Sequence, residues 1–135
     1  MALQLAVSVR NAMLDAIETD TGTSPRLKIK SGAAPADCAA ADSGTVLADI
    51  TCPSDFMAAA GSGAKAKSGT WQDTSADATG TAAHFRLYKS DGTTCQAQGT
   101  VTVTGGGGDM TVDSVSFTAA QQFTVTGFTL TAGNA

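Results

Sequence analysis

The sequence predicts a mainly β fold: an antiparallel β-sandwich or jelly-roll-like domain with one N-terminal α-helix. A helical period of apolar residues occurs only near the N-terminus, whereas the remainder alternates apolar and polar residues with a period of two. Turn-forming residues divide that remainder into short segments at intervals that suit a sandwich. At 135 residues, the chain suits one domain over residues 1–135, with a helical arm over 1–20 and a β-rich body over 24–135.

The only convincing helix is expected over residues 3–18. One side of it carries four large apolar residues at intervals of four: Leu5, Val9, Met13 and Ile17. Arg10 and the acidic residues near the end make the far side polar, and Gly22 with Pro25 stops the helix. Such a stripe usually packs on the protein's own sheet, and an arm that grips a neighbouring protein is the alternative.

The body is expected to form about seven strands. They cover residues 26–30, 45–51, 64–72, 81–88, 94–104, 110–117 and 123–130, with a loop over 33–43. Alternation predicts a solvated face on the first strand, formed by Arg26, Lys28 and Lys30. On the fourth strand it places His84, Arg86 and Tyr88 outward. The fourth strand then turns three apolar residues inward: Ala83, Phe85 and Leu87.

The composition predicts a core of small side chains. The chain contains 25 Ala, 20 Thr and 15 Gly, and only 5% of its residues are aromatic. Because an Ala buries far less area than a Leu or Phe, we expect no large aromatic cluster. We expect instead a protomer that completes its burial against partners.

Charge and cysteine content set expectations for ligands and compartment. The net charge of −4 argues against nucleic acid as the main ligand, since phosphate binding needs a dense basic surface. No apolar stretch reaches the length of a membrane span, and the N-terminus lacks the pattern of a secretory signal. Cys38, Cys52 and Cys95 are odd in number and widely spaced, so they predict neither a disulfide framework nor a zinc site. We therefore expect a chain made in a cytoplasm, with reduced thiols.

No pattern in the sequence nominates an enzyme. The single histidine, His84, cannot form a multi-histidine metal site, and nothing near the cysteines activates a nucleophile. The glycine run at residues 105–108 is followed by Asp109 and not by the Lys and Ser/Thr of a phosphate-binding loop. The acidic residues of the turns lack the calcium-loop pattern: Asp73, Asp77, Asp91, Asp109 and Asp113. We assign no catalytic, cofactor-binding or metal-binding residue and expect no cofactor.

Two parts of the sequence are expected to contact partners. One is the apolar stripe of the helix, and the other is a flexible hairpin tip at residues 105–108. The candidate contact residues are Leu5, Val9, Met13, Ile17, Gly106 and Gly107. A carbohydrate-binding β-sandwich module is an alternative from another class of function. Its only candidate aromatic platforms are Trp71 and Tyr88, and both are expected to pack in the sheet.

Several segments resemble a group of small structural proteins of tailed-phage particles. The sequence VRNAMLDAI at residues 9–17 precedes a short basic strand and the turn SGAAP at residues 31–35. The middle (residues 74–87 and 90–93) and the end (residues 123–135) are also similar to that group. The resemblance covers nearly the whole chain, and its motifs are structural, not catalytic.

The resemblance implies a virion component without enzymatic activity, made in the host cytoplasm. Capsid decoration or cement proteins of tailed phages are similar in size and β-content. They imply a homo-oligomeric protein on the capsid exterior that bridges subunits of the major capsid protein. A tail or neck component of the same particle is the alternative, and neither role implies nucleic acid or a membrane as partner.

Overall fold

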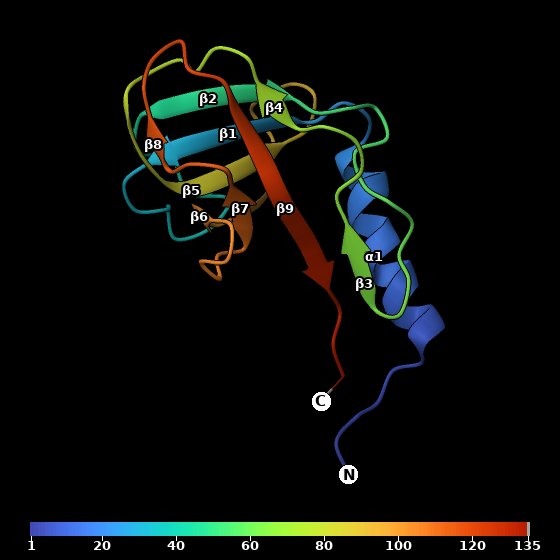
Figure 1. Ribbon diagram of the computed structural model, residues 1–135. Coiled ribbons are helices and arrows are strands. Elements are labelled where there is room, and N and C mark those ends of the chain that lie inside the picture. Colours follow the sequence, from blue (N-terminus) through green and yellow to red (C-terminus); the bar gives the residue numbers. More distant parts are fainter. Residues whose placement is uncertain (135) are drawn as a thin grey trace.

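The computed structural model describes residues 1–134, over which it has one helix and nine strands (Figure 1). The elements are α1 (Val7–Thr21), β1 (Arg26–Ser31), β2 (Val46–Thr51), β3 (Ala64–Ala66), β4 (Gln72–Asp73), β5 (Gly80–Tyr88), β6 (Cys95–Val103), β7 (Met110–Val112), β8 (Ser116–Phe117) and β9 (Phe123–Thr131). The predicted mainly β class with a single N-terminal helix is confirmed. Residue 135, the last of the expected domain, lies outside the described residues.

The strands form one continuous sheet that curls around the core. Its main path runs β2-β1-β5-β6-β7-β9-β3, while β4 pairs with β9 and β8 pairs with β5. Within residues 1–134 the named strand pairs are antiparallel except β6 and β7, whose register places Val101 beside Met110. The architecture is therefore a curled mixed sheet shaped like a half-barrel.

The glycine run joins β6 to a parallel strand, so the predicted hairpin tip is wrong in its geometry. Neighbouring parallel strands usually need a crossover of a dozen or more residues, and here residues 104–109 suffice. Gly105 (φ 84°) and Gly107 (φ 80°) adopt left-handed backbones, and a Cβ on Gly106 would lie 2.7 Å from Thr102. Glycine permits this short connection because other residues are strained or blocked at these positions.

Aromatic side chains are few, but the curled sheet gathers them into its core. All five Phe and Trp71 are buried. The Trp71 ring lies 6.1 Å from Phe56 and 5.6 Å from Phe128, whose ring is 5.5 Å from Phe85. The expectation of no aromatic cluster is wrong, because residues spread over more than 70 positions meet in three dimensions.

A loop covers the outer face of β1 and β5, and it buries side chains that were predicted to face outward. We call residues 32–43 the covering loop. Beneath it Lys30, His84 and Arg86 are at most 3% exposed, and Tyr88 is also buried. Ala83 is exposed and Ala82 buried in its place, because the β1–β5 register shifts beside this residue and changes which side chains face inward.

The helix begins and ends later than its pattern predicted. Residues 1–6 are not helical, and Leu5 exchanges two hydrogen bonds with the Asn134 side chain, at 2.8 and 3.1 Å. At the other end, the Gly22 amide donates to Glu18 O at 2.9 Å, which confirms the predicted stop. α1 lies along β3 at one edge of the sheet (Figure 1). Over residues 1–134, no helix is long and apolar enough to cross a bilayer.

Candidate functional site

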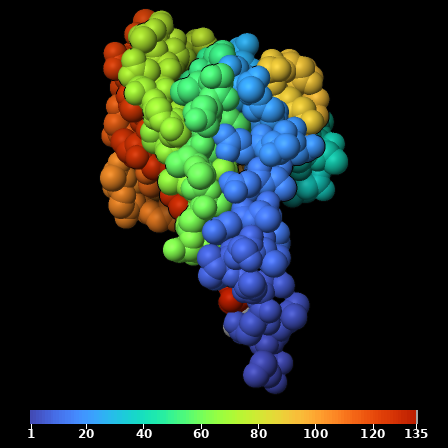
Figure 2. Space-filling model, turned by 90° about the vertical axis from the view of Figure 1, so that its right-hand side faces the viewer, coloured from blue at the N-terminus to red at the C-terminus, as the bar shows by residue number. Residues whose placement is uncertain are grey.

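The apolar stripe of α1 faces solvent. Val9, Met13 and Ile17 are 46%, 52% and 38% exposed, and Leu5, which precedes the helix, is half-buried. Figure 2 views the molecule from the side of α1, and the blue N-terminal arm extends beyond the β-rich body. The first expectation, that the stripe packs on its own sheet, is therefore wrong. We call Val9, Met13 and Ile17 the apolar stripe below.

The polar side of α1 faces the body instead. The Arg10 guanidinium donates to Ala132 O at 3.0 Å, and Asn11 Oδ1 accepts the Gly63 amide at 2.9 Å. Both contacts join the helix to residues next to the pair β3–β9. Leu14 is the only large apolar residue of the helix that is buried. Polar contacts thus fix the helix with its apolar side outward.

Lys65 of β3 provides the strongest of these contacts. Its side chain is 1% exposed, and its Nζ lies 2.7 Å from both Asp15 and Glu18 of α1. Nζ also donates to Ala58 O at 2.8 Å, and Asp15 accepts the Ala60 amide. An ammonium group with little access to water needs such partners, because burying an unpaired charge is costly. The ion pairs of Lys65 therefore determine where α1 packs on the body.

The ionisation of this group follows from its geometry. The hydrogen bond from Lys65 and that from the Ala60 amide lower the pKa of Asp15 below its ordinary value. Burial alone would lower the pKa of Lys65, but its hydrogen bonds to Asp15 and Glu18 outweigh that effect, and the pKa is raised. Both shifts favour the charged forms of Asp15 and Lys65, so the helix is held by an ion pair.

A groove of about 530 Å³ runs between α1 and residues 54–59. Its polar lining includes Asp15, Glu18 and Asp55 around Lys65, while Met57 and Ala58 contribute apolar surface. No histidine or cysteine lines it, and within residues 1–134 no three metal-ligating side chains are placed so that they could hold a metal ion together. The groove continues the polar attachment of α1 to the body.

The glycine connection is the second predicted contact region, and the structure does not bring it together with the stripe. Gly106 and Gly107 are exposed on the loop between β6 and β7, whereas the stripe lies on α1 beside β3. The loop is well ordered by hydrogen bonds: Gly106 donates to Val103 O at 2.8 Å and Gly108 to Thr102 Oγ1 at 3.0 Å. Its four glycines, residues 105–108, offer backbone and no side chains to a partner, while the exposed residues Thr104 and Asp109 flank them.

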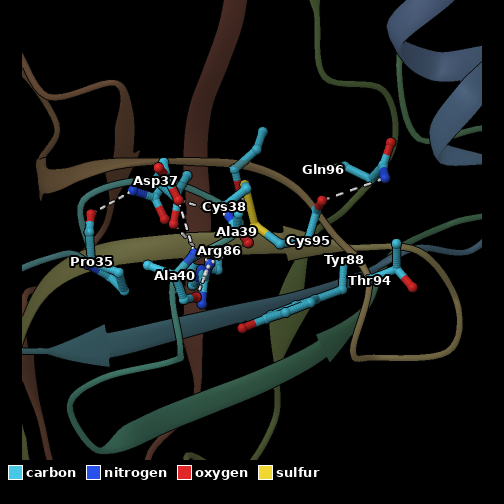
Figure 3. The surroundings of a disulfide bond; sticks show 12 residues. Pro35, Asp37, Cys38, Ala39, Ala40, Arg86, Tyr88, Thr94, Cys95 and Gln96 are labelled. Atoms are coloured by element: carbon cyan, nitrogen blue, oxygen red, sulfur yellow. Dashed lines mark hydrogen bonds between the residues drawn. A yellow bond between two sulfur atoms is a disulfide. The ribbon is translucent and has the colours of Figure 1, made fainter.

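The covering loop is a feature that the sequence did not predict, and a disulfide anchors it. Cys38 of the loop is bonded to Cys95 at the start of β6, across 57 positions of sequence, with a Cα–Cα distance of 5.4 Å (Figure 3). The prediction of reduced, unpaired thiols is wrong for these two residues. Cys52 is free and buried, and burial raises its pKa to about 12, which fits the inert role predicted for it.

Arg86 holds the covering loop from below (Figure 3). Its Nη2 donates to the carbonyls of Asp37, Cys38 and Ala40 at 3.0–3.2 Å. Asp42 of the loop lies 2.6 Å from Lys30 and accepts the Tyr88 hydroxyl at 2.9 Å. Burial alone would raise the pKa of Asp42, but hydrogen bonds from Lys30, Tyr88 and Arg86 outweigh it and bring the pKa to about 2. Lys30 and Arg86 therefore bind the covering loop instead of solvent, whereas Arg26 and Lys28 stay half-buried.

The other residues considered for metal or carbohydrate binding make contacts that stabilise the fold. His84 is 1% exposed and its Nδ1 lies 2.8 Å from Gly32 O, so it packs in the sheet. Trp71 and Tyr88 are buried, as expected, and neither forms an exposed platform. Two turn aspartates accept local amides, Asp73 from Ser75 and Asp91 from Thr93 and Thr94. Asp113 accepts the amide of Thr124, eleven positions away.

Comparison with known proteins adds no relative. No family model, no curated protein and no solved structure matches this chain.

Proposed function

We propose that this chain is a structural protein of a tailed-phage particle, a capsid decoration or cement protein that bridges subunits of the major capsid protein. The observation that carries the proposal is the exposed apolar stripe of α1, which is fixed from behind by buried charge. A helix that turns its apolar side to water has a surface suited to docking. The resemblance to structural proteins of tailed phages is the reason for proposing that the particle is a phage.

The physical role would be to add contact area across the joints of a shell. Each copy would make a modest contact through a short helix, and many copies on a lattice would bind together far more strongly than one. The net charge of −4 suits a surface away from packaged DNA. The covering loop, closed by its disulfide, would keep the body rigid while the arm docks.

Quantitative mass spectrometry of purified particles tests the placement. A copy number that follows the capsid lattice supports a role on the shell. A copy number that follows the symmetry of the tail or neck moves the protein there, and its absence from purified particles contradicts the proposal.

Particles assembled without the chain test the role itself. We expect them to rupture at lower temperature and under milder osmotic shock, because contacts across the joints are missing. Adding the purified protein back should restore resistance, and adding the Val9→Glu variant should not, since a charge on the stripe opposes docking. Equal robustness of particles with and without the chain would rule out a cement role.

A further inference from the structure

The exposed apolar surface of this chain is concentrated in its N-terminal arm. Seven large apolar side chains are exposed within residues 1–134, and six of them belong to residues 1–17: Met1, Leu3, Val7, Val9, Met13 and Ile17. The seventh, Val103, is the last residue of β6 and lies next to the glycine connection. If a second copy of the chain covers the apolar stripe, the only apolar surface of matching size that it can present is its own stripe.

The residues of the outer helix face are spaced symmetrically. At about 100° per residue, Val9, Met13, Ile17 and Asp20 of α1 fall on one side of the helix, in line with its N-cap residue, Ala6. Their intervals are three, four, four and three, so Met13 is the midpoint. An antiparallel copy turned about a two-fold axis at Met13 places Val9 against Ile17 and Ala6 against Asp20. Ala12 and Ala16 are exposed beside the stripe and allow two helices to approach closely.

The two ends of α1 complement each other. Its N-cap residue, Ala6, makes no side-chain cap hydrogen bond, and no acidic residue lies in the first turn. The first amides of a helix lack intrahelical partners and carry the positive end of its dipole. At the other end Asp20 is 72% exposed, lies 3.7 Å from Lys89 in a weak surface pair, and has no basic residue in its own turn of the helix.

Orientation follows from these ends. In an antiparallel pair, Asp20 of each copy lies beside the uncapped helix N-terminus of the other, so both mismatched ends are compensated. In a parallel pair, Asp20 would face Asp20 and the two helix dipoles would be aligned. The antiparallel arrangement is favoured on both counts.

We infer that α1 binds α1 of a second copy of this chain as an antiparallel, two-fold symmetric helix pair centred on Met13. The inference deepens the proposed function, and it rests on that proposal only in treating the stripe as a docking surface. A pair of 15-residue helices buries less than a standard interface, so the isolated dimer dissociates at low concentration. Copies held on one particle meet at high local concentration, where the pair persists.

Analytical ultracentrifugation of the full chain over micromolar to millimolar concentrations measures the pairing. We expect a monomer–dimer equilibrium whose dissociation constant rises about tenfold or more in Val9→Glu, since each pair would then bury two unpaired charges. Val103→Glu is the matched control, because Val103 is 44% exposed against 46% for Val9 and lies off the arm. The control should dimerise like the unaltered chain, and circular dichroism should show all three folded.

Cross-linking tests the orientation. A mixture of Val9→Cys and Ile17→Cys chains, treated with a short bismaleimide, should give mainly mixed dimers. The native cysteines do not compete, because Cys38 is bonded to Cys95 and Cys52 is buried. Cross-links between two Val9→Cys chains that outnumber the mixed product would show a parallel pair and overturn the inference.

The inference and the proposed function fail in different ways. A chain that stays monomeric at every concentration, or whose dimer is weakened equally by both Glu substitutions, overturns the helix pair even if particles contain the protein. A dimer that responds as expected, in a protein that purified particles lack, supports the pair and contradicts the phage role.

Discussion

Lys65 fixes the position of the whole helix through one buried ammonium group. Its partners Asp15 and Glu18 lie about fifty positions away in sequence, on the side of α1 that faces the body. The helix contributes little apolar burial, with Leu14 as its one large buried apolar residue. The energy that orients α1 is therefore electrostatic and local, which is unusual for an amphipathic helix.

Replacing this ammonium group should loosen α1. We expect Lys65→Met to lower the free energy of unfolding by about 2 kcal/mol, because two carboxylates lose their shared cation while remaining partly exposed to water. Urea unfolding followed by tryptophan fluorescence and circular dichroism measures the change. Lys89→Met removes only an exposed pair at 3.7 Å and should change stability little. Equal effects of the two substitutions would show that Lys65 does not hold the helix.

The sequence patterns predicted the core residues of a strand better than they predicted the contacts of its outward side chains. The strand alternation at β5 correctly placed Phe85 and Leu87 in the core, but it did not predict that Arg86, on the outward side, is buried as well. Nothing local in the sequence indicates that residues 37–40 supply carbonyls to Arg86, since those contacts span more than 45 positions. The same limit applies to Lys65, whose alternation with Lys67 is typical of a solvated strand.

The disulfide between Cys38 and Cys95 joins the covering loop to the start of β6. Closing a loop of 57 residues removes conformational entropy from the unfolded chain worth about 4 kcal/mol in the simplest model. We expect a reductant to lower the unfolding midpoint accordingly and to speed amide exchange at Thr45, which donates to Ser31 Oγ beside the loop. Differential scanning fluorimetry and hydrogen exchange provide the two measurements.

A double variant separates the bond from other effects of the reductant. Cys38→Ser/Cys95→Ser should begin at the lower midpoint and show no further response, because buried Cys52 is already unpaired. An unaltered chain that is indifferent to reductant would contradict the role of the disulfide in stability.

Elements were predictable where their signals are local. The helix stop at Gly22, the two long strands β5 and β6 and the last strand β9 all lie where the sequence placed them, to within a few residues. The predicted strand over 64–72 divides into β3 and β4, because Gly69 adopts φ 70° between them. The parallel pairing of β6 with β7 was not predictable, since a short glycine-rich connection ordinarily signals a hairpin.

The sequence analysis did not predict which side of α1 packs on the body. An apolar stripe alone favours packing inward, and the sequence analysis preferred that interpretation. Recognising the reverse requires knowing that Arg10, Asn11 and Asp15 have partners at Ala132, Gly63 and Lys65. Long-range polar contacts determine the orientation of α1, and they leave the apolar stripe exposed.

The stability of the entire fold should fall in acid, and carboxylates explain the direction. Asp42 has a folded pKa of about 2 against an ordinary value of 3.8, so its contribution is present above pH 3.8 and is lost as pH falls towards 2. Asp15 and Asp109 also have lowered pKa values and add to this slope, whereas the raised pKa of Asp77 opposes it. Urea unfolding between pH 5 and 2 should show the decline.

Asp42→Asn tests which group dominates that decline. The variant should be less stable than the unaltered chain near neutral pH, because the buried side chains of Lys30 and Arg86 lose their anionic partner. Its stability should then change less between pH 3.8 and 2. An unchanged slope would assign the acid sensitivity to other carboxylates.

The two chain ends meet at Leu5 and Asn134, at the outer end of α1 (Figure 1). Any polypeptide fused to either terminus therefore emerges next to the apolar stripe and would obstruct it. An affinity tag at a terminus could make a working subunit look inert.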